Sequence, residues 1–312
     1  MVSDPQGAVP LVTVVFSRDR AMQLEACLAS FAAHCHEAAS LPVDVLYTGS
    51  SPALAAQYGV VERAWRDRLR LRFHHERDFR AELLALLGAP ARPAPGRAGL
   101  KLRRLFGART ATEEGSGPPY VLFLVDDNVF VRPFSLAEAL DALAARPRAL
   151  GFSLRLGRNT TYCYSHDAPQ RVPDLAPVAP DLAAYDWTTA EHDFGYPLEV
   201  SSSLYSIPAV GSSLAGLPFT NPNTLEAQFA ATARSWAARR PELLCYERSV
   251  TFCNAVNKVQ AVFDNRAGAD QELTAEELAR RFDQGERIDT GALSGFVPDA
   301  CHGDVPFSFT QT

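Results

Sequence analysis

The sequence predicts an α/β fold in which helices cover a mostly parallel sheet. Short apolar segments rich in β-branched residues alternate with helical segments through the first half of the chain, an order typical of parallel sheets. Of the 312 residues, 47 % are hydrophobic, which is enough for a large core. Disorder and coiled-coil architecture are therefore excluded for most of the chain.

The N-terminal elements repeat the order of strand and helix three times. Residues 11–16 have the length and composition of a buried strand, which stops at a polar turn. A helix follows, because apolar side chains recur on one helical face at Leu24, Leu28, Phe31 and Cys35. The pattern continues with strands at 43–48 and 69–73 and helices at 53–69 and 79–87.

The C-terminal half begins with the most apolar strand of the chain, residues 120–125. Ser135 with Glu138 fits a capping box that opens the next helix, and Thr274 with Glu277 opens another at 274–282. The remaining expectations are strands at 149–156 and 198–207, a proline-rich loop at 169–180 and a helix at 224–238.

Residues 88–119 are rich in proline and glycine around a basic cluster, and we predict a mobile loop there. A connection of this length inside a compact domain is usually functional or disordered. The sequence leaves open whether the loop has no direct chemistry or whether its cations approach an anionic ligand or membrane surface. The cations are Arg97, Lys101, Arg103, Arg104 and Arg109.

Charge and cysteine content limit the function classes. With 30 basic and 36 acidic residues the net charge is −6, so nucleic acid is not an expected partner. No apolar run reaches the roughly 20 residues of a membrane span, and the first residues lack the pattern of a secretory signal. We therefore expect a cytoplasmic protein.

The cysteines of the chain form no CxxC pair. They are expected to be buried thiols rather than zinc ligands: Cys27, Cys35, Cys163, Cys245, Cys253 and Cys301.

The strand at 120–125 runs directly into Asp126-Asp127-Asn128. Ligands of open α/β sheets bind at the carboxyl ends of the strands, where these side chains are expected. Neighbouring carboxylates repel each other unless a cation lies between them, and oxygen ligands suit Mg²⁺ or Mn²⁺. The alternative is a turn in which Asp and Asn bond their own backbone.

The order of these motifs resembles the GT-A glycosyltransferases, in particular the bacterial family-2-like enzymes that use nucleotide sugars. The segments that carry the resemblance are Ser17 to Arg20, Asp126 to Asn128, Glu199 to Tyr205, Asn221 to Glu226, Asn254 to Gln260 with Asn265-Arg266, and His302 to Phe307. The resemblance implies a single GT-A domain over 1–312. Residues 8–134 would form the nucleotide-sugar half and 135–312 the acceptor half.

The resemblance also implies a donor site. The residues bordering the nucleotide would be Phe16, Ser17, Arg18, Thr48 and Gly49. Asp126 and Asp127 would occupy the DXD position, which holds the ribose and, through Mn²⁺ or Mg²⁺, the diphosphate. The implied metal ligands are Asp127, Asn128 and His302. Asn128 replaces the usual second acid and carries no charge, so weaker metal binding is expected, and His302 alone is as compatible with an ordinary surface histidine.

An inverting reaction would need a carboxylate base. Glu226 has the position that the resemblance implies, although Glu226 would equally serve as a helix cap by reaching back to the Asn223 amide. Asp193 and Glu199 are the alternative candidates for this base. On the acceptor side the candidates are Trp187, Tyr196 and Glu199; the two rings would stack on a sugar unless they pack in the core.

The resemblance implies a metal-assisted enzyme of polysaccharide biosynthesis. It would move a sugar from a nucleotide diphosphate donor, expected to be UDP-linked, to a saccharide or lipid-linked acceptor. Separately from the resemblance, the basic cluster at 97–109 leaves open a peripheral contact to the inner face of the membrane. Asn128 and Ala227 keep open a non-catalytic nucleotide-sugar-binding module. A sugar nucleotidyltransferase is disfavoured, because no glycine-rich turn follows the first strand.

Overall fold

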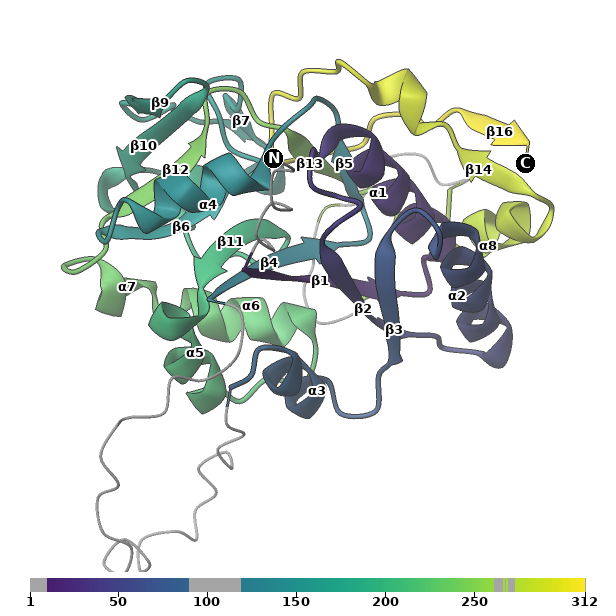
Figure 1. Ribbon diagram of the computed structural model, residues 1–312. Coiled ribbons are helices and arrows are strands. Elements are labelled where there is room, and N and C mark those ends of the chain that lie inside the picture. Colours follow the sequence, from purple (N-terminus) through teal and green to yellow (C-terminus); the bar gives the residue numbers. More distant parts are fainter. Residues whose placement is uncertain (1–9, 90–118, 261–265, 267, 269–272, 312) are drawn as a thin grey trace, which may run out of the picture.

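The computed structural model describes residues 10–89, 119–260, 266, 268 and 273–311 (Figure 1). The strands of its main sheet are β1 (Leu11–Arg18), β2 (Pro42–Thr48), β3 (Arg70–His75), β4 (Tyr120–Val125), β6 (Ala149–Ser153), β9 (Ala176–Ala179), β10 (Leu182–Asp186), β11 (Ser202–Ser206) and β12 (Glu242–Tyr246). The helices are α1 (Ala21–His34), α2 (Pro52–Trp65), α3 (Phe79–Leu86), α4 (Leu136–Ala144), α5 (Ile207–Gly216), α6 (Pro222–Ala230), α7 (Ala233–Trp236) and α8 (Ala275–Asp283).

Within the described residues the main sheet has nine strands in the order β3-β2-β1-β4-β11-β6-β12-β10-β9. Neighbours from β3 to β4 are parallel, and so are β6 and β12. Only β11 and β10 run against the other strands of this sheet. The predicted α/β fold with a mostly parallel sheet is confirmed, and the sheet passes without a break from the N-terminal to the C-terminal half of the chain.

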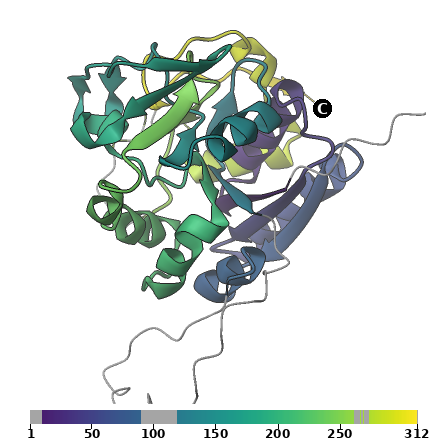
Figure 2. The ribbon, with the colours of Figure 1, turned by 60° about the vertical axis from the view of Figure 1, so that its left-hand side comes forward.

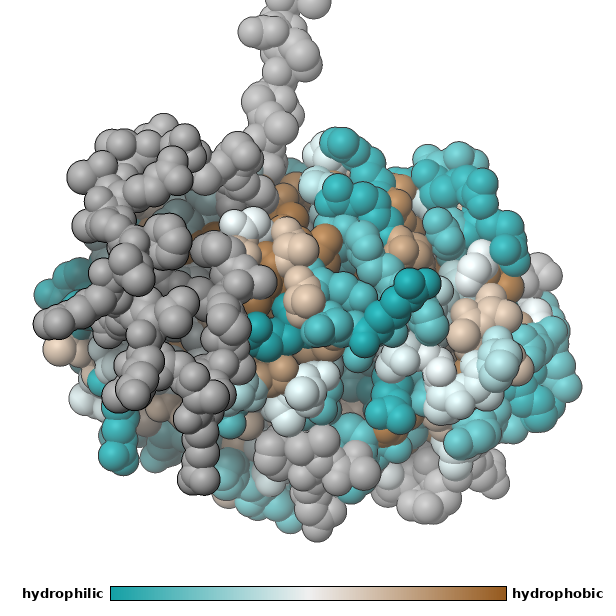
Figure 3. Space-filling view, turned by 90° about the horizontal axis from the view of Figure 1, so that it is seen from below, coloured by the Kyte–Doolittle hydropathy of each residue, from teal (hydrophilic) through white to brown (hydrophobic). Residues whose placement is uncertain are grey.

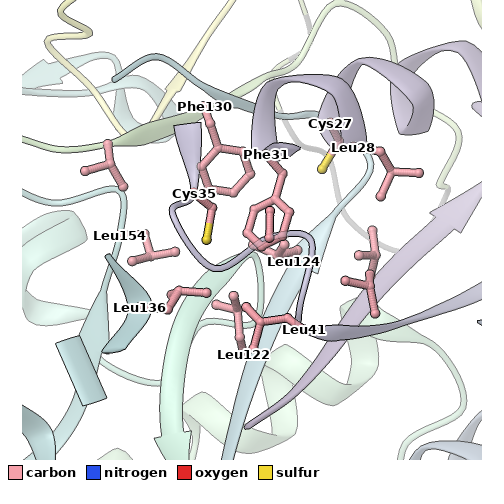
Figure 4. Packing of buried hydrophobic residues seen from close by; sticks show 14 of the residues in the cluster. Cys27, Leu28, Phe31, Cys35, Leu41, Leu122, Leu124, Phe130, Leu136 and Leu154 are labelled. Atoms are coloured by element: carbon pink, nitrogen blue, oxygen red, sulfur yellow. The ribbon is translucent and has the colours of Figure 1, made fainter. Parts of the chain in front are cut away.

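Helices cover both faces of the sheet (Figures 1 and 2). The alternation of side chains along each strand separates two cores: Leu11 and Val15 of β1 point to one, and Val12, Val14 and Phe16 to the other. The first core includes α1, α2, α4 and α8, and the second includes α3, α5 and α6. Figure 4 shows the first core, where α1 packs over β4. Seen from below, most of the described surface is hydrophilic, with smaller apolar areas between (Figure 3).

Three small sheets complete the described fold. The one that matters for the site has the order β15-β13-β5, from β5 (Asn128–Phe130), β13 (Thr251–Asn254) and β15 (His302–Gly303). β7 (Tyr162–Cys163) pairs with β8 (Ala168–Pro169), and β14 (Glu286–Ile288) pairs with β16 (Phe309–Gln311). Among the described residues no helix is both long and apolar enough to cross a membrane, and all six cysteines are buried free thiols.

Several predicted boundaries were wrong. The strand expected from 198 begins only at Ser202, because the Glu199 carboxylate binds the backbone N–H groups of Ser201 and Ser202. The helix expected over 224–238 is divided into α6 and α7 at Thr232, whose hydroxyl donates to the Phe229 carbonyl in place of a regular helical turn.

Other segments were misassigned or fall outside the described part. The loop expected at 169–180 contains β9, which pairs with β10, a strand that was not predicted. α5, β12 and β13 were also not predicted. Most of the loop expected at 88–119, namely 90–118 with its basic cluster, lies outside the described residues.

Replacing Phe31 tests the first core. Phe31 is 1 % exposed, and its ring lies 5.3 Å from that of Phe130. We expect Phe31→Ala to lower the free energy of unfolding by about 3–5 kcal/mol, because it removes apolar contact and leaves a cavity. Urea unfolding measures the change. Phe296→Ala, at a ring that is 38 % exposed, is the control and should cost much less; equal losses would contradict the packing described.

Candidate functional site

A cavity of about 470 Å³ lies at the carboxyl ends of β1 and β4. Its volume is within the range of small-molecule sites. Both halves of the chain contribute to its wall. The sequence-predicted residues that line it are Phe16, Ser17, Arg18, Thr48, Asp126, Asp127, Asp193, Tyr196, Glu226 and His302.

Asp126 joins the ends of the two central strands. One of its carboxylate oxygens accepts hydrogen bonds from the Ser17 hydroxyl at 2.8 Å and from the Arg18 backbone N–H at 3.3 Å. The side chain is 6 % exposed. Ser17 is also 2.8 Å from the Tyr58 hydroxyl of α2, so the acid is anchored to β1 and indirectly to α2. Asp126 therefore forms the floor of the cavity.

Arg20 holds the acidic pair together. Its Nη1 lies 3.2 Å from an Asp126 oxygen and 3.3 Å from an Asp127 oxygen. Its Nε donates to the Asn257 side-chain oxygen at 2.8 Å, and its Nη2 donates to the Asn257 backbone carbonyl. In the sequence Arg20 stands out only as part of the polar turn after the first strand. Its place directly after β1, on the same sheet edge as the two acids, was the available signal.

The two carboxylates differ in their surroundings. Burial raises the pKa of Asp126 above its ordinary value, Arg20 opposes this rise, and the neighbouring Asp127 charge adds to it. Asp127 lies at the cavity wall, and its Oδ1 is buried without a hydrogen-bond partner. A buried carboxylate oxygen without a partner is costly unless a cation or a donor from a ligand binds it. Asp127 therefore has one oxygen available to a ligand.

β13 brings the C-terminal segment to the acidic turn. Its residue Cys253 pairs with Asn128 of β5 on one side and with His302 of β15 on the other. The Asn254 N–H also donates to the Asp127 carbonyl at 2.8 Å. His302 and Asp127, far apart in the sequence, thus line the same cavity, an arrangement that depends on a strand the sequence did not predict.

His302 is half-buried beside a buried cation. Its Nε2 lies 3.3 Å from the Nη1 of Arg155. Burial, and then the Arg155 charge, lower the pKa of His302 to about 3, so the imidazole is neutral near pH 7. A neutral ring is the form that binds a metal, although Nε2 is already occupied by this contact. Arg155 was also missed by sequence reasoning, because only its long-range contacts distinguish it from a strand-end arginine.

Asn128 does not reach the cavity, contrary to the expected metal-ligand role. The residue is fully buried. Its Oδ1 accepts from the Val125 N–H at 2.9 Å, and its amide nitrogen lies 3.4 Å from the Cys253 sulfur. The amide closes the turn after β4, as the alternative Asx turn predicted. Only Asp126 and Asp127 of this triplet face the cavity.

Glu226 points into the cavity from α6 and does not cap that helix. The cap is Asn221, whose side-chain oxygen accepts from the Thr224 N–H. In return, the Thr224 hydroxyl oxygen accepts from the Asn221 N–H. One Glu226 oxygen accepts from the Val200 N–H at 3.0 Å, and the other lies 3.5 Å from the Tyr196 hydroxyl. The expected cap to Asn223 was wrong. Burial, with the nearby Glu199 charge, raises the pKa of Glu226, and Arg155 opposes the rise.

Asp193 faces the same cavity from a 3-10 turn, η3 (His192–Gly195). The residue is 7 % exposed, and its Oδ2 is buried without a hydrogen-bond partner. The turn is held by the Gln170 side chain, which accepts from the Asp193 N–H at 3.1 Å. The cavity therefore has unpartnered carboxylate oxygens on two parts of its wall, at Asp127 and at Asp193.

Three expected contact residues lie outside the cavity wall. Glu199 is 2 % exposed, and its oxygens accept from the Ser201 and Ser203 hydroxyls and from the Ser202 N–H. One oxygen also lies 3.9 Å from the Arg155 Nε. Glu199 therefore positions this segment and does not contact an acceptor in the cavity. Trp187 is a core residue whose Nε1 donates to the Arg240 carbonyl at 2.7 Å. Gly49 packs on α2, where an added Cβ would lie 2.6 Å from the Ala55 nitrogen.

Comparison with known proteins relates this chain to glycosyltransferases. The bifunctional glycosyltransferase pgtA of Dictyostelium discoideum is 24 % identical over 291 residues, which cover 85 % of this chain and 34 % of that protein. The chain thus spans about a third of the length of the curated relative. No family model matches. The similarity confirms the predicted resemblance to glycosyltransferases, while the bacterial subgroup stays a prediction.

Solved structures overlap with the chain only in part. TarS of S. aureus has a TM-score of 0.46 at 12 % identity, over 78 % of this chain and 36 % of TarS. The mannosyltransferase PcManGT from Pyrobaculum calidifontis, solved with GDP-Man and Mn²⁺, has a TM-score of 0.43 at 14 % identity, over 83 % of this chain and 60 % of its own. These scores are too low to transfer any site, so the site rests on the geometry of this protein.

Replacing Arg20 tests whether its charge stabilises the acidic floor of the cavity, the pair Asp126 and Asp127. Arg20→Met leaves the buried Asp126 carboxylate and the partly buried Asp127 carboxylate without their cation, and we expect it to lower the free energy of unfolding by about 3–5 kcal/mol near neutral pH. Since Arg20 opposes the raised pKa of Asp126, the variant should protonate Asp126 more readily, and the loss should shrink toward about pH 5.

Urea unfolding at several pH values measures this. In the wild-type protein, the contribution of Asp126 to stability is fully present below the ordinary carboxyl pKa of about 4 and is lost as the pH rises through its raised pKa. Arg18→Met is the control, because the Arg18 side chain is 55 % exposed. A loss of unfolding free energy in Arg20→Met that does not depend on pH, or an equal loss in Arg18→Met, would contradict the stabilising role of the contact between Arg20 and the two carboxylates.

Proposed function

We propose that the chain is a GT-A-type glycosyltransferase domain that moves a sugar from a nucleotide diphosphate donor, with UDP as the expected nucleotide, to a saccharide or lipid-linked acceptor. The observation that carries the proposal is the acidic floor at the carboxyl ends of β1 and β4, with an available Asp127 oxygen. Ligands of α/β sheets bind at this edge. The sequence similarity to a glycosyltransferase supports the same activity.

The donor would lie over the ends of β1, β2 and β4. Phe16 and Thr48 offer an apolar and a hydroxyl surface for the nucleoside, and Arg18 offers an exposed cation for phosphate oxygens. Both oxygens of Asp126 already bind protein groups, namely the Ser17 hydroxyl, the Arg18 N–H and the Arg20 guanidinium. Its main role is therefore to hold these groups, and the one donor contact that we assign to it is a hydrogen bond from a ribose hydroxyl. Asp127 is the acid with free bonding capacity.

A divalent cation fits beside Asp127. The evidence is its buried Oδ1 without a partner, a hard oxygen of the kind that Mg²⁺ and Mn²⁺ prefer. His302, which lines the same cavity, is the second residue that would hold the ion, with Nε2 exchanging its contact with Arg155 for the ion. When bound, the ion would offset the charge that develops on the leaving diphosphate. Asn128 is not part of this ligand set, which supports the expectation of weak metal binding.

Glu226 is our candidate for the base. Its carboxylate is anchored at one oxygen by the Val200 N–H, while the other faces the cavity near the Tyr196 hydroxyl. The raised pKa makes it a stronger base than an ordinary glutamate, so it can accept a proton from an acceptor hydroxyl. Tyr196 is 37 % exposed at the rim and would contact the acceptor. Asp193 is the second carboxylate within the cavity.

Donor turnover tests the proposed activity. We expect the full chain with Mn²⁺ to release nucleoside diphosphate from at least one UDP- or GDP-sugar, and removal of the cation with a chelator to slow the release. Asp127→Asn should weaken donor use by roughly tenfold to a hundredfold, because about 1.5–3 kcal/mol of charge-assisted bonding is lost. Nucleotide binding without turnover of any donor would instead indicate the non-catalytic module.

The two carboxylate candidates can be separated by matched amide variants. If Glu226 is the base, Glu226→Gln lowers kcat by roughly 10²- to 10⁴-fold with a small change in KM, and Asp193→Asn does not. The acidic limb of the wild-type pH profile should lie above the ordinary glutamate pKa, since the base acts when ionised. A large kcat loss only in Asp193→Asn would assign the role to Asp193 instead.

A further inference from the structure

One side-chain cluster at the cavity wall has no role in the proposed transfer. Cys163, His166 and His192 each offer one ligand atom, and these atoms all lie within 4.8 Å of one another. The Cys163 sulfur is 3.2 Å from the His166 Nδ1. The His166 and His192 rings have centroids 5.0 Å apart. Three potential metal ligands from two separate loops therefore converge on one point.

The cluster has the chemistry of a zinc site. Thiolate and imidazole together favour Zn²⁺, whereas carboxylate and carbonyl oxygens favour Mg²⁺ and Mn²⁺. A tetrahedral zinc ion with Zn–S of about 2.3 Å and Zn–N of about 2.1 Å separates sulfur from nitrogen by about 3.5 Å. The observed 3.2 Å between Cys163 and His166 is close to that value. The ligand atom of His192 lies within 4.8 Å of the other two, so it would complete a three-residue ligand set.

The surroundings leave the site accessible on one side. Cys163 is fully buried in β7, His192 is half-buried and His166 is exposed. Both histidines line the large cavity. A metal ion would thus reach the cluster from the cavity, with the buried sulfur behind it. The Ser165 hydroxyl lies 3.3 Å from the His166 Nδ1 and 3.4 Å from the Cys163 sulfur, so it also borders the cluster.

We propose that Cys163, His166 and His192 bind a zinc ion whose fourth position faces the cavity, open to water or to an oxygen of a bound molecule. The ion would tie the turn η1 (Tyr164–His166) to η3, the turn that carries Asp193. It would therefore fix part of the acceptor-side wall. The sequence carries no signal for this role, because Cys163 has no metal-binding spacing with another cysteine and lies beside the histidines only in the folded chain.

Metal titration of the full chain tests the site. We expect a single Zn²⁺ ion per chain, and Co²⁺ in its place should give a sulfur-to-metal charge-transfer band together with strong four-coordinate d–d bands. His166→Ala should weaken Zn²⁺ binding by more than the roughly 10- to 100-fold typical of losing an outer-shell partner. His166 is exposed, so this variant should keep its fold.

Matched variants separate this site from the one at Asp127. Cys163→Ser should abolish the charge-transfer band, whereas His36→Ala, at an exposed histidine elsewhere, should leave it intact. Asp127→Asn should also leave it intact, so failure of the zinc site and failure of the proposed transferase activity are distinguishable. Absence of Zn²⁺ binding to the wild-type chain, a Co²⁺ spectrum without the sulfur band, or unchanged binding in His166→Ala would overturn the proposal.

Discussion

The contact of Arg20 with Asp126 and Asp127 is the interaction on which the cavity depends. It joins the turn after β1, the turn after β4 and Asn257 through a single guanidinium. Without Arg20, the buried Asp126 carboxylate and the partly buried Asp127 carboxylate would repel each other at this sheet edge. With Arg20 in place, Asp126 can hold the ends of the two central strands while Asp127 keeps one oxygen unpartnered.

The remaining wall follows from how the second half of the chain returns to this edge. β13 lies between β5 and β15 and brings His302 toward the acidic turn, and α6 directs Glu226 inward from the opposite part of the wall. The cavity consequently combines Asp127, which could bind a cation, with the exposed Arg18 and the buried Arg20. It also holds Glu226, whose pKa is raised, and Asp193, which has an oxygen without a partner. Preorganised charges of this kind can stabilise charge that develops during a reaction, which is why the proposed transfer is assigned to this cavity.

Sequence reasoning was most successful where local pattern decides structure. The β-branched runs of β1, β2 and β4 and the caps at Ser135 and Thr274 were predicted because each depends on neighbouring residues. It failed where distant contacts decide. Trp187 packs in the core, where its N–H donates to the distant Arg240 carbonyl, and His302 reaches the cavity only because β15 pairs with β13. The Asn128 amide, by contrast, closes a local turn through the Val125 N–H, which was the alternative open at that position. The cluster of Cys163 with two histidines was likewise invisible without the fold.

The most direct test of the central claim is nucleotide binding at the Asp127 edge, measured as the thermal unfolding midpoint of the full chain titrated with UDP, GDP and other nucleotides in the presence of Mn²⁺. A ligand that binds only the folded state raises the midpoint progressively above its Kd. The account predicts such a rise for at least one nucleoside diphosphate, and a smaller one in Asp127→Asn. A midpoint that no nucleotide moves would contradict it.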